Sequence, residues 1–207
     1  VRSFPGDHLD ARGIEPIAHT ATLARAVLMG PGMGDHRDTI EAIHALVKKV
    51  KVPVVLDAQA IPALDRNNLR ENSRVLITPH AQEFSDFCGE HFPSLLIEKV
   101  EHVKKIAARF NVNILVKNPI DVISSFDGQF CINQTGNPGM TSGGTGDVLS
   151  GFVAGLMARG LAPYDAARIG VFIVCAAGDE LLEQKSHAFT ATDLALRLPY
   201  TIKNMFG

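Results

Sequence analysis

The chain has 207 residues, of which 46% are hydrophobic, enough to bury one sizeable core, so we expect a single domain over residues 1–207. Its formal net charge is −2, from 20 Lys and Arg against 22 Asp and Glu, which argues against nucleic acid or a membrane surface as the main partner. No apolar run approaches the roughly 18 residues of a membrane span, and the three separated cysteines form no CxxC pattern, so we expect a reduced, cytoplasmic protein.

Short aliphatic runs alternate with turn residues and helical patterns along the chain. The predicted strands are Ala26–Met29, Pro53–Leu56, Arg74–Ile77 and Asn113–Val116, then a hairpin of residues 122–125 and 130–133 around Asp127-Gly128. The predicted helices are Asp38–Val50, Ile97–Phe110, one from Asp147 that Gly160 closes, one near Asp165–Leu182, and one from about Thr192 or Asp193 to Pro199. Nearly continuous apolar strands alternating with helices predict a mostly parallel sheet covered on both faces.

Glycines or polar residues follow each of the first four predicted strands. GPGMG (30–34) follows the first, Asp57 the second, TPH (78–80) the third and Lys117 the fourth. In open α/β sheets, ligands bind outside the carboxyl ends of the parallel strands. We therefore expect these segments to converge on one rim, together with the glycine-rich stretch that precedes the closing helices.

That stretch is NPGMTSGGTGDVLSG (137–151), and it runs directly into an apolar helical pattern. Glycines let the backbone approach a ligand, and a helix N-terminus offers unpaired N–H groups, which together favour an anion site. The pattern is not a P-loop, because no Lys-Ser/Thr follows the glycines. Asp147 at the join has two interpretations: the N-cap of the helix, or a base that takes a proton from a hydroxyl beside a bound phosphoryl group.

The strand-end residues also have structural alternatives. His80 could contact a ligand or begin a capping box with Glu83. Asp57 could be a turn residue or a substrate or metal contact, and Lys117 could be solvated or could neutralise a phosphate. Asp121 and Asp127-Gly128 look like turn residues. No His, Cys or Asp set has metal-ligand spacing, so we expect no protein-held metal, and any Mg²⁺ would arrive with phosphates.

Five segments in this order resemble the ribokinase-like ADP/ATP-dependent NAD(P)H-hydrate dehydratases. They are GPGMG (30–34), VVLDAQA (54–60), TPHAQEF (78–84), LVKNPIDVIS (115–124) and NPGMTSGGTGDVLSG (137–151). The resemblance extends from about Ala26 to the last predicted helix. It implies a ribokinase-like three-layer α/β/α fold and an enzyme that repairs hydrated NADH or NADPH. A nucleotide, more often ADP, phosphorylates the ring hydroxyl, and loss of phosphate restores the double bond.

The resemblance also implies roles for particular residues. Asp147 would be the catalytic base, with Gly144 and Gly146 in the anion-binding loop. The substrate-binding residues would be Gly32, Gly34, Asp57, His80 and Asp147. The nucleotide-binding residues would be Lys117, Asn118, Pro119, Ile120, Asp121, Gly143 and Gly146, with Mg²⁺ accompanying the nucleotide. A homo-oligomer is also implied.

Three features depart from the family pattern. Asn118 stands where the family usually has Gly after the lysine, and Gln59 stands where LDAD is frequent. Members usually have a Gly/Ser-rich loop and several strands upstream of the point where this chain begins, so we expect the family's sheet to be incomplete here. The alternatives are a ribokinase-like kinase for a hydroxyl of a vitamin precursor or sugar, and a nucleotide-binding module without chemistry.

Overall fold

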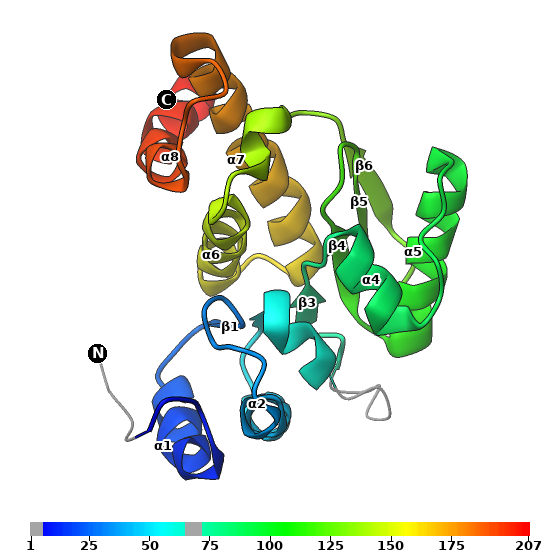
Figure 1. Cartoon of the computed structure of the whole chain (residues 1–207), viewed down its shortest axis with the longest axis vertical. Coiled ribbons are helices and arrows are strands. Elements are labelled where there is room, and N and C mark those ends of the chain that lie inside the picture. Colours follow the sequence, from blue (N-terminus) through cyan, green and yellow to red (C-terminus); the bar gives the residue numbers. More distant parts are fainter. Residues whose placement is uncertain (1–5, 65–71) are drawn as a thin grey trace.

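The computed structural model describes residues 6–64 and 72–207, and in these a mostly parallel sheet lies between two layers of helices (Figure 1). The strands follow one another across the sheet in chain order. They are β1 (Val27–Met29), β2 (Val54–Leu56), β3 (Val75–Ile77), β4 (Asn113–Val116), β5 (Asp121–Ser124) and β6 (Phe130–Asn133). Strands β1 to β4 are parallel, whereas β5 and β6 each run antiparallel to the strand before. The predicted strands and hairpin are confirmed.

Alternate residues of each central strand enter two different cores, because successive side chains of a strand point to opposite faces. In β2, Val54 and Leu56 belong to one core and Val55 belongs to the other. The first core is covered by α2 (Arg37–Lys49), α4 (Ala81–Cys88) and α5 (Leu96–Phe110), and α1 (Ala11–Ala21) packs on α2. The central strands are thus buried on both faces, which explains their continuous apolar character.

The opposite face of the sheet is covered by the C-terminal part of the chain. Its helices are α6 (Thr145–Ala158), α7 (Pro163–Lys185) and α8 (Ala191–Phe206), with α8 packed on α7 away from the sheet (Figure 1). There are also two short 3₁₀ helices in the described residues: η1 (Ala58–Ala63) follows β2, and η2 (Pro138–Thr141) precedes α6. No helix in residues 6–64 and 72–207 is both long enough and apolar enough to cross a membrane.

Helix α1 is absent from the sequence prediction because glycine and proline interrupt its helical pattern. Gly13 is buried in the helix, and Pro16 lies inside it, and both residues have low helix propensity. The helix starts at Asp10, whose carboxylate accepts the N–H of Arg12 at 2.9 Å, and it is packed on α2. Capping and tertiary packing therefore outweigh propensity here.

The predicted end of the last helix at Pro199 is wrong, because α8 continues through this residue to Phe206. Contacts beyond the proline hold the helix in place. The hydroxyl of Thr201 donates to Glu180 Oε2 of α7 at 2.8 Å, and Ile202 and Met205 pack against the second core. These contacts offset the hydrogen bond that a proline removes from a helix interior.

We predict that Pro199→Ala stabilises the protein. Pro199 is exposed within α8, so alanine restores a backbone donor without disturbing a core. The free energy of unfolding should rise by about 1 kcal/mol, well below the full intrinsic difference of about 3 kcal/mol, because α8 is already fitted to the proline. Urea denaturation measures this change in the free energy of unfolding. A fall in stability would show that the proline's shape is needed for the α7–α8 packing.

Candidate active site

The carboxyl ends of the four parallel strands form one continuous rim. Backbone hydrogen bonds extend the ladder beyond the strands: the N–H of Asp57 donates to Met29 O at 3.0 Å, and that of Thr78 donates to Leu56 O at 3.1 Å. The N–H of Lys117 donates to Pro79 O at 2.8 Å, so that His80 and Lys117 form an isolated parallel bridge. The predicted convergence of the strand-end segments is therefore confirmed, and His80 and Lys117 are neighbours.

An ion pair crosses the rim from β4 to β2. Lys117 Nζ lies 2.8 Å from Asp57 Oδ1, and the Asp57 side chain is only 2% exposed against 24% for Lys117. A buried carboxylate is costly unless it has a partner, so Lys117 is held toward the rim. The interpretation of Lys117 as a freely solvated strand end is wrong.

The glycine-rich loop reaches the same ammonium group. A Cβ atom placed on Gly146 would lie 3.5 Å from Lys117 Nζ, and α6, which begins at Thr145, packs against β1 and β2. A loop far along the chain is thereby placed beside the strand-end ion pair. This juxtaposition joins two halves of the predicted site.

The start of α6 presents free amide groups. Gly144 is the N-cap, with a φ of +89° that favours glycine. The N–H of Thr145 donates to Ser142 O, whereas those of Gly146 and Asp147 meet no acceptor among the described residues. Unpaired amides at a helix N-terminus attract anions.

Asp147 is not the N-cap of α6, so that structural interpretation is wrong. It is the third residue of the helix and is exposed on the first turn, directly after Gly146. An acid in the first turn is favoured by the helix dipole. The carboxylate is therefore free to act on something outside the helix, which is the arrangement a base requires.

The loop before α6 is tied to α7 by a residue that the sequence analysis does not single out. Asp179 accepts the N–H of Gly136 at 2.9 Å and the side-chain amide of Asn137 at 2.9 Å. Asn137 in turn caps η2 by accepting from Gly139 N. The available signal in the sequence was an aspartate within the apolar pattern of α7. The two hydrogen bonds show that Asp179 positions the loop.

The GPGMG loop contacts the rim through Gly30, which is not among the predicted site residues. At Gly30 a Cβ atom would lie 1.8 Å from the backbone oxygen of Asp57, and its φ is +127°, so only glycine fits there. At Gly32 and Gly34 no atom of the described residues would lie within 4 Å of such a Cβ. Gly30 therefore brings the loop against β2, and the predicted ligand contacts at Gly32 and Gly34 stay predictions.

His80 serves as the N-cap of α4. Its Nδ1 accepts the N–H groups of Gln82 and Glu83, each at 3.2 Å, and Glu83 Oε2 accepts the N–H of His80 at 2.8 Å. The capping-box alternative is thus confirmed. Because Nδ1 is an acceptor, the proton of a neutral ring lies on Nε2, which is 3.5 Å from Glu83 Oε1, and the His80 side chain is 54% exposed.

Residues 118–121 form a turn that is closed from inside the protein. Asp121 begins β5 and is buried, with Oδ1 accepting the N–H of Asn118 at 3.0 Å and Oδ2 accepting from Asn133 Nδ2 at 2.9 Å. Asp121 thus closes the turn, as expected of a turn residue, but it does so as a buried acceptor at the start of β5. Pro119 is exposed and Ile120 half-buried at the outside of the turn, where a nucleotide contact stays a prediction.

Burial raises the pKa of the Asp121 carboxyl above its ordinary value of 3.8, and the hydrogen bonds from Asn118 and Asn133 offset part of this effect. A carboxyl with a raised folded-state pKa stabilises the fold while it is protonated, and this contribution is lost as the pH rises from 3.8 through the raised value. We predict that Asp121→Asn becomes more stable relative to the parent as the pH rises from 3.5 to 7. Urea midpoints across that range test this, with Asp165→Asn, at a partly exposed aspartate, as control, and a difference that shrinks with pH would contradict it.

The Asp57–Lys117 pair gives a second prediction. Lys117→Met should lower the free energy of unfolding by about 3 kcal/mol, because it leaves a buried charge without its partner. Adding Asp57→Asn to that variant should restore most of the loss. The exposed pair Lys49–Glu15 at 2.7 Å supplies the control, since Lys49→Met should cost less than about 1 kcal/mol. Equal costs for the two lysines would show that the rim pair is not buried in solution.

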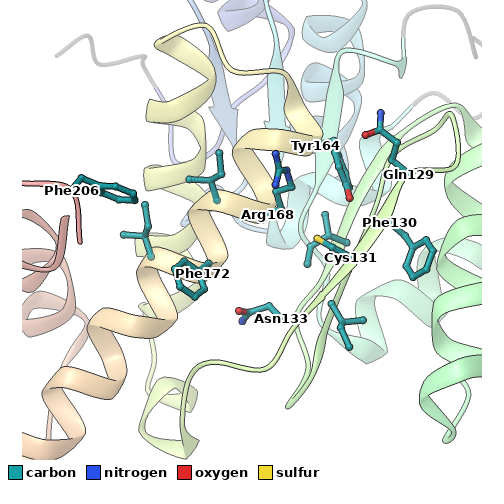
Figure 2. Close-up of a pocket in the computed structure, with 12 residues that line it drawn as sticks. Gln129, Phe130, Cys131, Asn133, Tyr164, Arg168, Phe172 and Phe206 are labelled. Atoms are coloured by element: carbon teal, nitrogen blue, oxygen red, sulfur yellow. The ribbon is translucent and has the colours of Figure 1, made fainter. Parts of the chain in front are cut away.

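A separate hollow of about 610 Å³ lies between the outer strand β6 and helix α7 (Figure 2). Phe130, Cys131, Tyr164, Arg168 and Phe172 are among the residues that line it. None of the predicted site residues lies in it, so the rim is located by the strand ends and not by this hollow.

The implied homo-oligomer stays a prediction.

Comparisons with known proteins agree with this geometry. The sequence profile of the family described as NAD(P)H-hydrate dehydratase matches residues 8–200. The bifunctional NAD(P)H-hydrate repair enzyme Nnr of Moorella thermoacetica is 34% identical over 205 residues, which cover 97% of this chain and 39% of the relative. The chain therefore spans about two fifths of the length of that relative.

Solved structures give the same result. The ADP/ATP-dependent NAD(P)H-hydrate dehydratase from Bacillus subtilis, co-crystallised with ATP/Mg²⁺ and soaked with CoA, has a TM-score of 0.73 and 29% identity, covering 90% of this chain and 71% of its own. A ribokinase-like superfamily protein from Enterococcus faecalis has a TM-score of 0.79 at 24% identity, covering 91% of this chain and 66% of its own. The fold is thus the ribokinase-like three-layer α/β/α class. Within it, the chain belongs to the NAD(P)H-hydrate dehydratase family.

Proposed function

We propose that this chain dehydrates hydrated NADH or NADPH at the expense of a nucleotide, with ADP as the preferred donor. The observation that carries the proposal is the position of Gly146, at the start of α6, beside the ammonium group of Lys117. Family membership supplies the reaction class, and this juxtaposition supplies a place in the chain where a phosphoryl group can be held.

The residues present fit a nucleotide phosphate. The amides of Gly146 and Asp147 are unpaired within the described residues, and the helix dipole adds partial positive charge at that point. Lys117 adds a full positive charge, of which the buried Asp57 balances a part. Mg²⁺ bound with the nucleotide supplies further neutralisation of the phosphoryl oxygens. The Bacillus subtilis neighbour co-crystallised with ATP/Mg²⁺ supports this part of the proposal.

Asp147, exposed in the first turn of α6, is the proposed base for the acceptor hydroxyl. As the ring hydroxyl attacks phosphorus, Asp147 takes its proton, and the bond between that phosphorus and the leaving nucleotide breaks. Phosphate then leaves with the hydroxyl oxygen while the neighbouring ring carbon loses a proton to water, which restores the double bond. The amides of the loop hold the phosphoryl oxygens during the transfer. Gly32, Gly34 and His80, on the loops around the rim, are the proposed substrate contacts.

The kinase alternative shares the first step but leaves the phosphate on the product. The matched family profile and the repair enzymes among the relatives do not favour it. An assay with hydrated NADH and ADP or ATP separates the two, because repair returns the dihydronicotinamide absorbance. Consumption of nucleotide without that return would overturn the repair assignment.

We predict that Asp147→Asn lowers turnover by roughly 10²-fold or more while nucleotide affinity changes little. The amide keeps the size of the side chain but cannot accept the proton. Asp165→Asn is a matched control, because Asp165 also lies in the first turn of an apolar helix, α7. Turnover is followed by the absorbance assay and affinity by calorimetry. Full activity in Asp147→Asn would show that another group is the base.

A further inference from the structure

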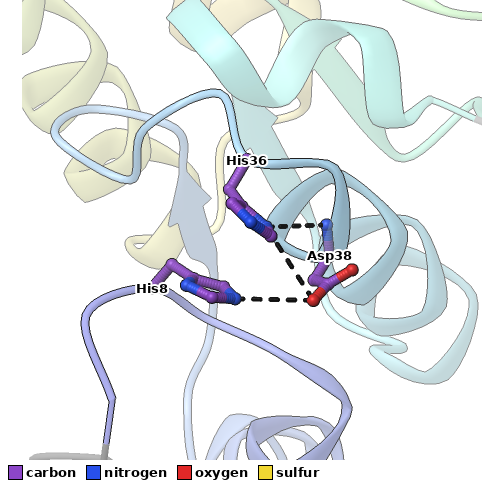
Figure 3. A group of neighbouring side chains, drawn as sticks. All are labelled: His8, His36 and Asp38. Atoms are coloured by element: carbon purple, nitrogen blue, oxygen red, sulfur yellow. Dashed lines mark hydrogen bonds and ion pairs between the residues drawn. The ribbon is translucent and has the colours of Figure 1, made fainter.

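Two histidines and an aspartate from separate segments meet at the junction between the chain before α1 and the start of α2 (Figure 3). They are His8, His36 and Asp38, and one ligand atom of each lies within 4.8 Å of the others. His8 Nε2 is 3.5 Å and His36 Nδ1 is 3.8 Å from the same oxygen, Asp38 Oδ2. The sequence shows no metal-ligand spacing here, because the cluster exists only through tertiary contact.

We propose that these three side chains bind one divalent transition-metal ion of the Zn²⁺ class. Nitrogen and oxygen ligands bind Zn²⁺ at about 2.0–2.2 Å, so two ligands of a tetrahedral ion lie roughly 3.4 Å apart. The observed separations of 3.5 and 3.8 Å from Asp38 Oδ2 are close to this value, and the ligand atoms of the three residues all lie within 4.8 Å of one another. Imidazole and carboxylate together suit Zn²⁺, and the partly exposed cluster leaves a fourth position for water.

The side chain of His8 is already oriented for this role. Its Nδ1 is 2.8 Å from Asp7 Oδ1, which turns Nε2 toward Asp38. A carboxylate behind a histidine is a usual second partner of metal-bound imidazoles, because it fixes the ring and its tautomer. The rings of His8 and His36 are stacked, with centroids 3.7 Å apart and planes 23° from parallel, so binding of one ion requires a ring to rotate until both ring planes contain the metal.

The two backbone segments are held together without the ion. The hydroxyl of Thr39, which is fully buried, donates to Leu9 O at 3.0 Å, and these residues adjoin Asp38 and His8 in the chain. The ligands are therefore brought into place by the fold. His36 Nδ1 accepts the N–H of Asp38 at 3.2 Å as the N-cap of α2, and coordination exchanges this long hydrogen bond for a metal bond.

A metal ion bound at this site would also restrain the neighbouring GPGMG loop. His36 follows the GPGMG loop after only one residue, Asp35, so a bound ion joins the end of that loop to the segment before α1. The proposed ion would thus join two segments of the chain through ligands that are separate from the predicted nucleotide-binding residues.

The test is Zn²⁺ binding to the chain, measured by competition with a chromophoric chelator, together with the visible spectrum of the Co²⁺ form. We expect one equivalent of Zn²⁺, a tetrahedral Co²⁺ spectrum, and a melting temperature raised by roughly 5 °C at saturating metal. His8→Gln and His36→Ser should each lower the affinity at least tenfold, and Asp7→Asn should lower it about tenfold through its effect on His8. Serine retains the capping function of His36.

His187→Ala, which removes an exposed histidine before α8, is the control and should bind Zn²⁺ as the parent does. Melting curves without metal establish whether each variant folds. If His36→Ser does not fold, His8→Gln still tests the site, because His8 lies outside any helix. Less than one equivalent of Zn²⁺ in the parent, or equal affinity in His8→Gln, His36→Ser and the parent, would overturn the proposal.

Discussion

The contact between Lys117 and Asp57 is the constraint on which the rest of the site depends. A lysine at the end of β4 and an aspartate at the end of β2 are joined across the intervening strand, with the carboxylate almost wholly buried. The pairing keeps the ammonium group at the rim, where Gly146 lies against it. The ion pair thus holds a positive charge beside the loop that begins α6 before any ligand arrives.

The glycine-rich loop before α6 is itself held in place by hydrogen bonds to α7. Gly144 supplies the left-handed backbone that starts α6, and Asp179 holds the two residues Gly136 and Asn137 from α7. A binding loop fixed by hydrogen bonds loses little conformational freedom when it takes up a ligand. This rigidity explains why so many glycines can lie together without making the loop a flexible linker.

Much of this arrangement follows from local sequence patterns. Strands buried on both faces produce continuous apolar runs, so the four parallel strands and the hairpin could be predicted within about a residue, as Phe130–Asn133 shows. The rule that ligands bind beyond the carboxyl ends of such strands then brought Asp57, His80 and Lys117 together. The family resemblance added the proposed roles of these residues.

The remainder depends on tertiary contacts that no local pattern records. The close approach of Gly30 to Asp57 depends on the neighbouring strand, so no local pattern marks Gly30. A proline ends a helix in most contexts, but here α8 packs against α7 and continues beyond Pro199. Asp121 resembles a turn residue in sequence and is a buried acceptor in the structure.

A crystal structure of the chain with Mg²⁺ and a non-hydrolysable nucleotide tests the central claim most directly. Our account predicts that a phosphate accepts hydrogen bonds from the amides of Gly146 and Asp147 and lies within ion-pair distance of Lys117 Nζ. A nucleotide bound with its phosphates elsewhere, for example in the hollow between β6 and α7, would contradict it.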